Sequence, residues 1–300
     1  IDVRMSTMPV QFGESVVMRL LDQTAGLLSF DQTGMPDDLI QRVRHQISRP
    51  HGMVLVTGPT GSGKTTTLYA GLSELNQASK KIITVEDPVE YRLARVNQVQ
   101  INSKIGLSFS AVLRTALRQD PDILMVGEMR DQETVEMGLR GALTGHLVLS
   151  TLHTNDAITS ALRLIDMGAA GFLVGSSLRA VIAQRLVRRV CDQCIVPHMP
   201  DSQELLWLNH LAGDAVNNAQ FKHGKGCQSC QYTGYKGRIG VFELLEMNEP
   251  DPIMHPRSID TDGDITEFGS MSVAKGTLWR VSFSWRDWRW RGSPSDIMHS

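Results

Sequence analysis

The chain has 300 residues and a formal net charge of −2, with 41% apolar and 21% charged residues, which is ordinary for a globular protein with room for about two domains. The near-neutral charge argues against nucleic acid as the main partner. No apolar run reaches the ~18 residues that a membrane-spanning helix needs. The first residue is Ile1 and no signal-peptide pattern follows, so we expect the chain to begin within a longer protein.

The first 22 residues predict two strands joined by a turn. Val3 and Met5 alternate with polar neighbours, residues 9–13 carry the turn, and residues 16–21 form an apolar run. Arg4 and Arg19 lie on these strands, and the pattern alone indicates solvent-facing charges. A linker is expected next, over 23–35, before a helix that starts near residue 36 with one apolar face.

Residues 53–67 carry the strongest motif of the chain. An apolar strand leads into a glycine-rich turn and a helix, and Gly58, Gly63, Lys64 and Thr65 fit the phosphate-loop pattern G-x-x-x-x-G-K-[ST]. Glycines let successive N–H groups face one anion, Lys64 is placed for the β- and γ-phosphates, and Thr65 for Mg²⁺. A chance glycine-rich turn would lack both flanking elements. The residues expected at the nucleotide here are Gly58, Pro59, Thr60, Gly61, Ser62, Gly63, Lys64, Thr65 and Thr66.

Three further strands are predicted at 82–85, 123–126 and 147–152. Glu86 follows the first strand, Glu128 follows the second after a glycine, and His146 and His153 flank the third. Acids at the carboxyl ends of such strands are typical of sites that hold Mg²⁺ or orient water. A lone histidine is more often structural, but a pair around one strand favours function.

Helices are predicted between and after these strands, at about 110–119, 156–167 and 172–187. The alternation of strands and helices predicts an α/β fold with a largely parallel sheet and helices on its faces.

Four cysteines form two C-x-x-C pairs, Cys191/Cys194 and Cys227/Cys230. Two tight turns can direct four thiolates at one ion, which makes a closed structural zinc site. Free thiols or a redox pair would not explain two pairs. The long spacer between the pairs is expected to carry its own helix at about 205–211.

In their order, these motifs resemble those of the secretion ATPase superfamily of type II secretion and type IV pilus machines. The phosphate loop matches its Walker A motif, residues 85–91 its Asp box, residues 126–131 its atypical Walker B motif, and residues 146–156 its His box. The resemblance covers residues 1 to about 250. The cysteine pairs are similar to those of the assembly branch, and above all to the extension ATPases of mannose-sensitive haemagglutinin (MSHA) pili.

This resemblance implies a RecA-like P-loop NTPase core with a small tetracysteine zinc module and the tail of a preceding α+β domain. The expected divisions are 1–30 for the end of that domain and a linker, 31–190 for the ATPase domain, 191–235 for the zinc module, 236–250 for the continuation of the ATPase domain, and 251–300 for an aberrant tail.

The resemblance further implies a hexameric cytoplasmic motor that hydrolyses ATP with Mg²⁺ and acts on an inner-membrane platform protein, reaching the membrane only through partners. Glu86 would activate the attacking water, while Thr65 and Glu128 would hold Mg²⁺. Arg4 and Arg19 would approach the γ-phosphate, which revises their interpretation as solvent-facing charges. The residues implied in catalysis are Lys64, Glu86, Glu128, His146 and His153.

Residues 251–300 depart from the family pattern. They contain four of the five tryptophans, among arginines and serines without periodicity. An aromatic and basic surface for nucleic acid or membrane is one interpretation. An out-of-frame, disordered segment is the interpretation we prefer.

Two other functions stay open from the sequence. A DNA uptake or translocation ATPase on the same core would be favoured by a basic patch facing a pore. A zinc-containing scaffold with an inactive nucleotide site is disfavoured by the intact Lys64, Thr65, Glu86 and Glu128.

Overall fold

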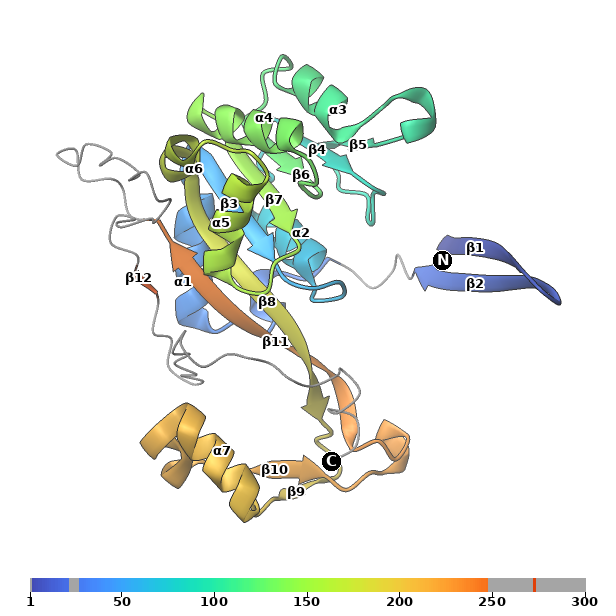
Figure 1. The fold of residues 1–300 in the computed structure, drawn as a ribbon, viewed down its shortest axis with the longest axis vertical. Helices are drawn as coiled ribbons and strands as arrows, with labels where there is room; N and C mark the ends of the chain where they lie inside the picture. The colour runs from blue at the N-terminus through green and yellow to red at the C-terminus, as the bar shows by residue number, and fades with distance from the viewer. Residues whose placement is uncertain (1, 22–26, 248–271, 274–300) are drawn as a thin grey trace. The chain divides into compact units, whose positions relative to one another are not determined.

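The structure is a computed structural model that describes residues 2–21, 27–247 and 272–273 (Figure 1). These residues divide into two units. The first runs to Val187 and resumes at Arg238, and the second holds Arg188–Gly237. The proposed tail (251–300) lies outside the described residues, apart from a short strand.

The first unit is organised around an eight-stranded sheet with the order β12-β11-β8-β3-β7-β6-β4-β5. Strand β3 pairs in parallel with β7 and β8, β4 pairs in parallel with β5 and β6, and β6 does so with β7. The carboxyl ends of these strands therefore meet at one edge. The strands are β3 (Gly52–Thr57), β4 (Ile82–Glu86), β5 (Val96–Gln100), β6 (Ile123–Val126), β7 (Leu147–Leu152), β8 (Leu178–Val190), β11 (Tyr235–Glu246) and β12 (Ser272–Val273).

Helices cover both faces of this sheet (Figure 1). Alternate residues of β3 explain the two layers: Met53 and Leu55 pack with α3–α6, while Val54 and Val56 pack with α1 and α2. The helices are α1 (Asp37–Ile47), α2 (Lys64–Leu75), α3 (Phe109–Ala116), α4 (Gln132–Leu143), α5 (Ala157–Asp166) and α6 (Gly171–Ser177), with two 3-10 turns, η1 (Phe30–Gln32) and η2 (Ser103–Ile105). An α/β fold with a parallel-dominated sheet is thus confirmed.

The predicted helix over 172–187 is wrong beyond Ser177. The chain there forms the short helix α6 and then strand β8, which is buried from Ala180 to Gln184. A strand covered on both faces is a continuous apolar run, and periodicity alone does not distinguish such a run from a buried helix. The predicted linker is also too long, because Phe30 and Met35 pack into the core beside α1.

The first 21 residues form the predicted pair of strands, β1 (Asp2–Val10) and β2 (Gly13–Leu21). They are antiparallel, and Arg4 lies directly opposite Arg19. Apolar side chains such as Met5 and Met18 are about two-thirds exposed, at 67% and 65%. A two-stranded ribbon of this kind is only marginally stable by itself.

The second unit is small and contains the cysteine pairs. Strands β9 (Ile195–Pro197) and β10 (Lys222–Gly224) pair in antiparallel fashion. The helix predicted in the spacer is present as α7 (Ser202–Ala212), which starts with a capping box between Asp201 and Glu204. The 3-10 turns η3 (Gly213–Asn218) and η4 (Gln228–Cys230) complete it. No helix among the described residues is long and apolar enough to cross a membrane.

Candidate nucleotide site and metal centre

The glycine-rich loop lies between β3 and α2, at the carboxyl edge of the sheet. Gly58, Gly61 and Gly63 have φ angles of +144°, +79° and +88°, a backbone region that side chains disfavour. A Cβ atom at Gly58 would lie 2.2 Å from the backbone oxygen of Gln184, whereas a Cβ at Gly61 would meet nothing within 4 Å. The loop therefore packs closely on one side and is open at Gly61, as a phosphate cradle requires.

Lys64 is the first residue of α2 and is 9% exposed. Its ammonium group donates hydrogen bonds to the carbonyls of Gly58 (2.8 Å) and Pro59 (3.0 Å). Burial lowers the pKa of Lys64, and the charge of Glu128 partly offsets this effect. The cation is thus positioned over the loop by the loop's own carbonyl groups and interacts electrostatically with Glu128, the acid that follows β6.

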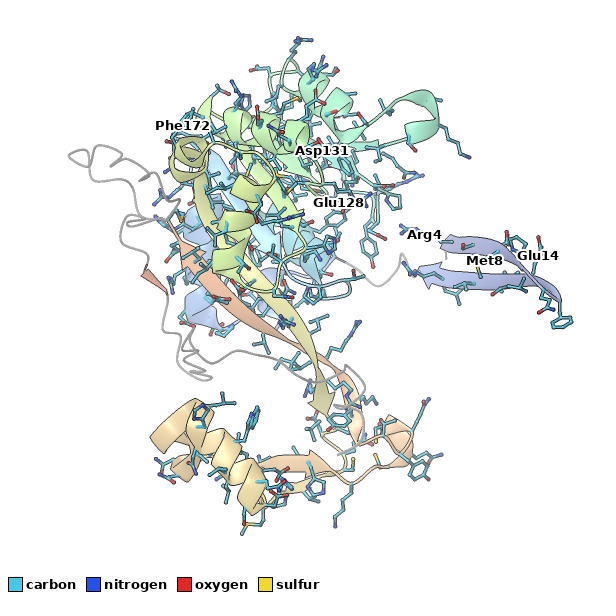
Figure 2. All side chains as sticks on the ribbon, viewed as in Figure 1. Arg4, Met8, Glu14, Glu128, Asp131 and Phe172 are labelled. Atoms are coloured by element: carbon cyan, nitrogen blue, oxygen red, sulfur yellow. The ribbon has the colours of Figure 1, made fainter. Side chains whose placement is uncertain are left out.

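Glu128 follows β6 (Figure 2). Its carboxylate meets two basic residues. Arg130 donates a hydrogen bond to one carboxylate oxygen of Glu128, and His153 Nε2 lies 3.7 Å from the other. The His153 side chain is 53% exposed; its partial desolvation and the positive charge of Lys64 lower its pKa, and the charge of Glu128 partly offsets this effect. Lys64, Glu128 and His153 therefore come from three elements and form one electrostatically coupled cluster.

Hydroxyl groups from β3 and β7 fix the strand ends that carry this cluster. Ser150 donates a 2.7 Å hydrogen bond to the last carbonyl of β6, and Thr151 donates one of the same length to the carbonyl of the glycine that follows. Thr57 Oγ1 donates to the carbonyl of Leu152 (3.1 Å), and the N–H of Thr154 donates to Thr57 Oγ1 (3.2 Å). These bonds place the residues before and after His153 beside the start of the glycine-rich loop.

Glu86 ends β4 and is 3% exposed. Its carboxylate accepts hydrogen bonds from Tyr69, Thr84 and Gln98, the last at 3.2 Å. Burial raises the pKa of Tyr69, and the hydrogen bond to Glu86 raises it further. Sequence reasoning found this acid and missed Tyr69 and Gln98, although polar residues within amphipathic or buried elements are a usable signal.

His146 is not part of this cluster, so the structure does not bring together the two histidines that the resemblance implies in catalysis. His146 precedes β7, and its backbone carbonyl accepts from the N–H of Gly52 (3.1 Å), which begins β3. Its ring Nδ1 lies 3.0 Å from the carbonyl of Gly141. A six-residue strand separates it from His153, and at ~3.3 Å per residue the two histidines lie at opposite edges of the sheet.

Arg4 and Arg19 face the same side of the β1–β2 ribbon because they are directly paired. Arg4 Nη2 lies 2.8 Å from Glu90 Oε2, and the two residues form a bidentate ion pair. Glu90 belongs to the acidic stretch after β4. The exposed fractions of both side chains, 33% and 31%, leave this pair partly hydrated.

The four cysteine sulfur atoms lie within 4.8 Å of one another. Sulfurs at ~2.3 Å around a tetrahedral zinc ion are ~3.8 Å apart, and the Cys191–Cys227, Cys194–Cys230 and Cys227–Cys230 distances are 3.9, 3.8 and 3.8 Å. All four thiols are free of disulfides. A hydrogen bond from the Cys227 backbone lowers the pKa of Cys230 to about 6, whereas burial raises the pKa of Cys194. The donor set fits a closed metal site.

A sequence profile of the family described as type II/IV secretion system protein matches residues 1–262. The chain belongs to this family. The match extends past residue 250, where the sequence predicts the resemblance to end.

Relatives in this secretion-protein family support the assignment. The type II secretion system protein E of Aeromonas hydrophila is 50% identical over 250 residues, which are 83% of this chain and 49% of the relative. The type IV pilus assembly ATPase PilB of Myxococcus xanthus is 49% identical over 244 residues, or 81% of this chain and 43% of the relative. The chain spans about half the length of the curated relatives it matches.

The fold is shared with a crystal structure of the pilus retraction motor PilT with bound ADP. The TM-score is 0.54 at 38% identity, covering 63% of this chain and 57% of the other. Within this chain, the described residues bring together Lys64, Glu128 and His153 at the loop, place Glu86 beside Tyr69, and leave His146 at the far edge.

Proposed function

We propose that this chain hydrolyses ATP as part of a motor that powers type IV pilus assembly, of the MSHA type, or type II secretion. The observation that carries the proposal is the convergence of Lys64, Glu128 and His153 on an open glycine-rich loop at a helix N-terminus. Such a loop binds phosphates through its N–H groups and the helix dipole. The assembly-branch resemblance and the pilus and secretion relatives support the biological role.

The residues of the site take distinct parts in this proposal. The loop N–H groups and Lys64 bind the β- and γ-phosphates, and Thr65 with Glu128 would hold Mg²⁺, which supplies charge stabilisation to the phosphoryl group. Glu86 orients the attacking water, from a position fixed by Tyr69 and Thr84. His153 lies beside the acid at the Mg²⁺ position.

The assembly state and partners are also proposals. We propose a homohexamer that works on an inner-membrane platform protein from the cytoplasmic side, with Arg4 and Arg19 approaching the γ-phosphate. We further propose that the cysteines bind one structural Zn²⁺. The ATPase domain would hold residues 31–190 with 236–250, and the zinc module 191–235, a division that the two structural units support.

The test is ATP turnover by the purified chain and by two variants, Lys64→Ala and Glu128→Gln. Each removes one electrostatic group at the transferred phosphate, and we expect a loss of about 10²–10³-fold in kcat. Phosphate release from Mg-ATP is the measurement.

Glu74→Gln is the matched control, because Glu74 is a carboxylate on the same helix as Lys64 but at its far end, paired with Arg44. It should retain full turnover. Turnover that is unchanged in both Lys64→Ala and Glu128→Gln would reject the proposal and favour a scaffold role.

A further inference from the structure

Gln184 is a buried polar residue of β8 that lies against the glycine-rich loop. It is 4% exposed, and the strand around it is apolar from Ala180 to Ala183. A buried glutamine in such a strand carries a desolvation cost unless its amide makes specific contacts. The contacts of the Gln184 amide therefore indicate its role in the structure.

Gln184 contacts the phosphate-binding segment at three residues. Thr67, in the first turn of α2, donates a 2.7 Å hydrogen bond to its side-chain oxygen. A Cβ atom at Gly63 would lie 2.8 Å from its side-chain nitrogen, and one at Gly58 would lie 2.2 Å from its backbone oxygen. One residue thus adjoins the first glycine of the motif, the last glycine, and the helix that follows.

The pairing of β8 with β3 fixes the position of Gln184 in the sheet. Ala183 is the register partner of Thr57, the residue before Gly58, so Gln184 lies at the level where the chain leaves β3 to form the loop. The next residue, Arg185, donates a 3.2 Å hydrogen bond to the carbonyl of Asn155. Gln184 therefore belongs to the sheet, and Gly58 and Gly63 pack on it without room for a side chain.

We propose that Gln184 is a positioning residue for the phosphate-binding loop. It makes no contact with the nucleotide and acts by keeping Gly58, Gly63 and the first turn of α2 in the shape that presents the N–H groups to phosphate. This inference rests on the proposed function. Groups that must be held within about 0.5 Å of a productive geometry depend on such supporting contacts.

The test is a double-variant cycle on the binding of Mg-ATP by this chain. Gln184→Met keeps the length of the side chain and removes its hydrogen-bonding amide, and Thr67→Val keeps the shape of threonine and removes its hydroxyl. Each leaves a buried polar group without its partner, so we expect the dissociation constant of a fluorescent ATP analogue and the KM to rise about tenfold, with a smaller change in kcat. Both variants remove the same hydrogen bond between Thr67 and Gln184. The double variant should therefore bind Mg-ATP no more weakly than whichever single variant has the lower affinity.

Gln46→Met is the matched control. Gln46 is also a glutamine with 4% exposure, but it lies on α1 and donates to Glu246 at 2.8 Å. It should lower the melting temperature by an amount similar to Gln184→Met and leave Mg-ATP affinity unchanged. An equal affinity loss in Gln46→Met would show a general structural effect and overturn the proposal.

Two further outcomes decide the matter. The role of Gln184 is rejected, while the proposed function stands, if the wild-type chain binds Mg-ATP and folded Gln184→Met binds it within twofold of wild type. The same conclusion follows if the effects of the two single variants multiply in the double variant. Wild-type chain that binds no Mg-ATP would overturn both the proposed function and this role. Should Gln184→Met fail to fold, Thr67→Val is compared with Gln184→Glu, which retains the acceptor for Thr67. Weak binding of Mg-ATP by Thr67→Val supports the positioning role, and wild-type affinity in Thr67→Val rejects it.

Discussion

The nucleotide unit and the cysteine unit are stabilised in different ways. Every residue of β3, β4, β6 and β7 is buried, so apolar packing on both faces of the sheet supports the glycine-rich loop. In the described part of the cysteine unit, the buried apolar side chains are Cys191, Val216 and Cys230, and α7 buries none. The difference indicates that the nucleotide unit can fold from its own core, and it predicts that the cysteine unit depends on a metal bound by its thiols.

Metal removal should give the largest effect and should be confined to the cysteine unit. Apparent binding free energies of structural zinc in small sites are about 10–16 kcal/mol at pH 7. We therefore expect a chelator, or Cys194→Ser, to abolish amide-exchange protection over 188–237 and to leave β3 and β7 protected. Hydrogen exchange measures this, alongside the zinc content of the untreated chain.

Ser229→Ala is a suitable control for that experiment, because Ser229 lies between the paired cysteines and should not change the metal content. Equal protection of the cysteine unit with and without metal would contradict the contrast between the two units.

A pair of leucine substitutions tests the same contrast at a smaller scale. Leu113 is 0% exposed in the nucleotide unit, whereas Leu206 on α7 is 76% exposed. Leu113→Ala should lower the free energy of unfolding by ~2–5 kcal/mol, because it leaves a cavity. Leu206→Ala should change it by no more than ~0.5 kcal/mol. Urea unfolding followed by circular dichroism measures both, and similar losses in the two variants would show that α7 is not exposed in solution.

The smallest predicted effect concerns His153 and pH. Its folded pKa lies below the ordinary ~6.5, so the unfolded chain takes up the proton first as pH falls. The stability that this residue contributes is present above pH ~6.5 and is lost as pH falls through the folded pKa. His153→Gln should therefore lose less stability than wild type between pH 7.5 and 5.

Urea unfolding at both pH values provides the measurement, and His146→Gln, at the other edge of the sheet, is the comparison. An identical pH dependence in wild type and His153→Gln would mean that the imidazole is not desolvated beside Lys64.

Local sequence was sufficient to predict several features of this protein. Gly58, Gly63 and Lys64 define the loop because glycine torsions and the start of a helix are properties of neighbouring residues. Strands β6 and β7 begin and end where the sequence predicts them. The paired cysteines indicated a metal site because each pair makes its own turn.

Other features were decided by residues that are far apart in the chain. The segment that forms β8 has no helical or strand periodicity that stands out, and it becomes a strand because β3 offers it a parallel partner. The two histidines look equivalent in the sequence, yet strand direction sends them to opposite edges of the sheet. Likewise, the sequence can mark Tyr69 and Gln98 as polar residues within their elements, but only the packing of α2 on the sheet brings them to Glu86.

The sequence by itself therefore determined the glycine-rich loop, the strand ends with their acids and the cysteine pairs, since their conformations depend on local torsions and spacing. The tertiary structure alone decided which of those residues meet. It placed Glu128 and His153 beside Lys64, left His146 at the opposite edge of the sheet, and set Gln184 against Gly58 and Gly63. Such contacts depend on register between strands that are distant in sequence, and no local pattern encodes that register.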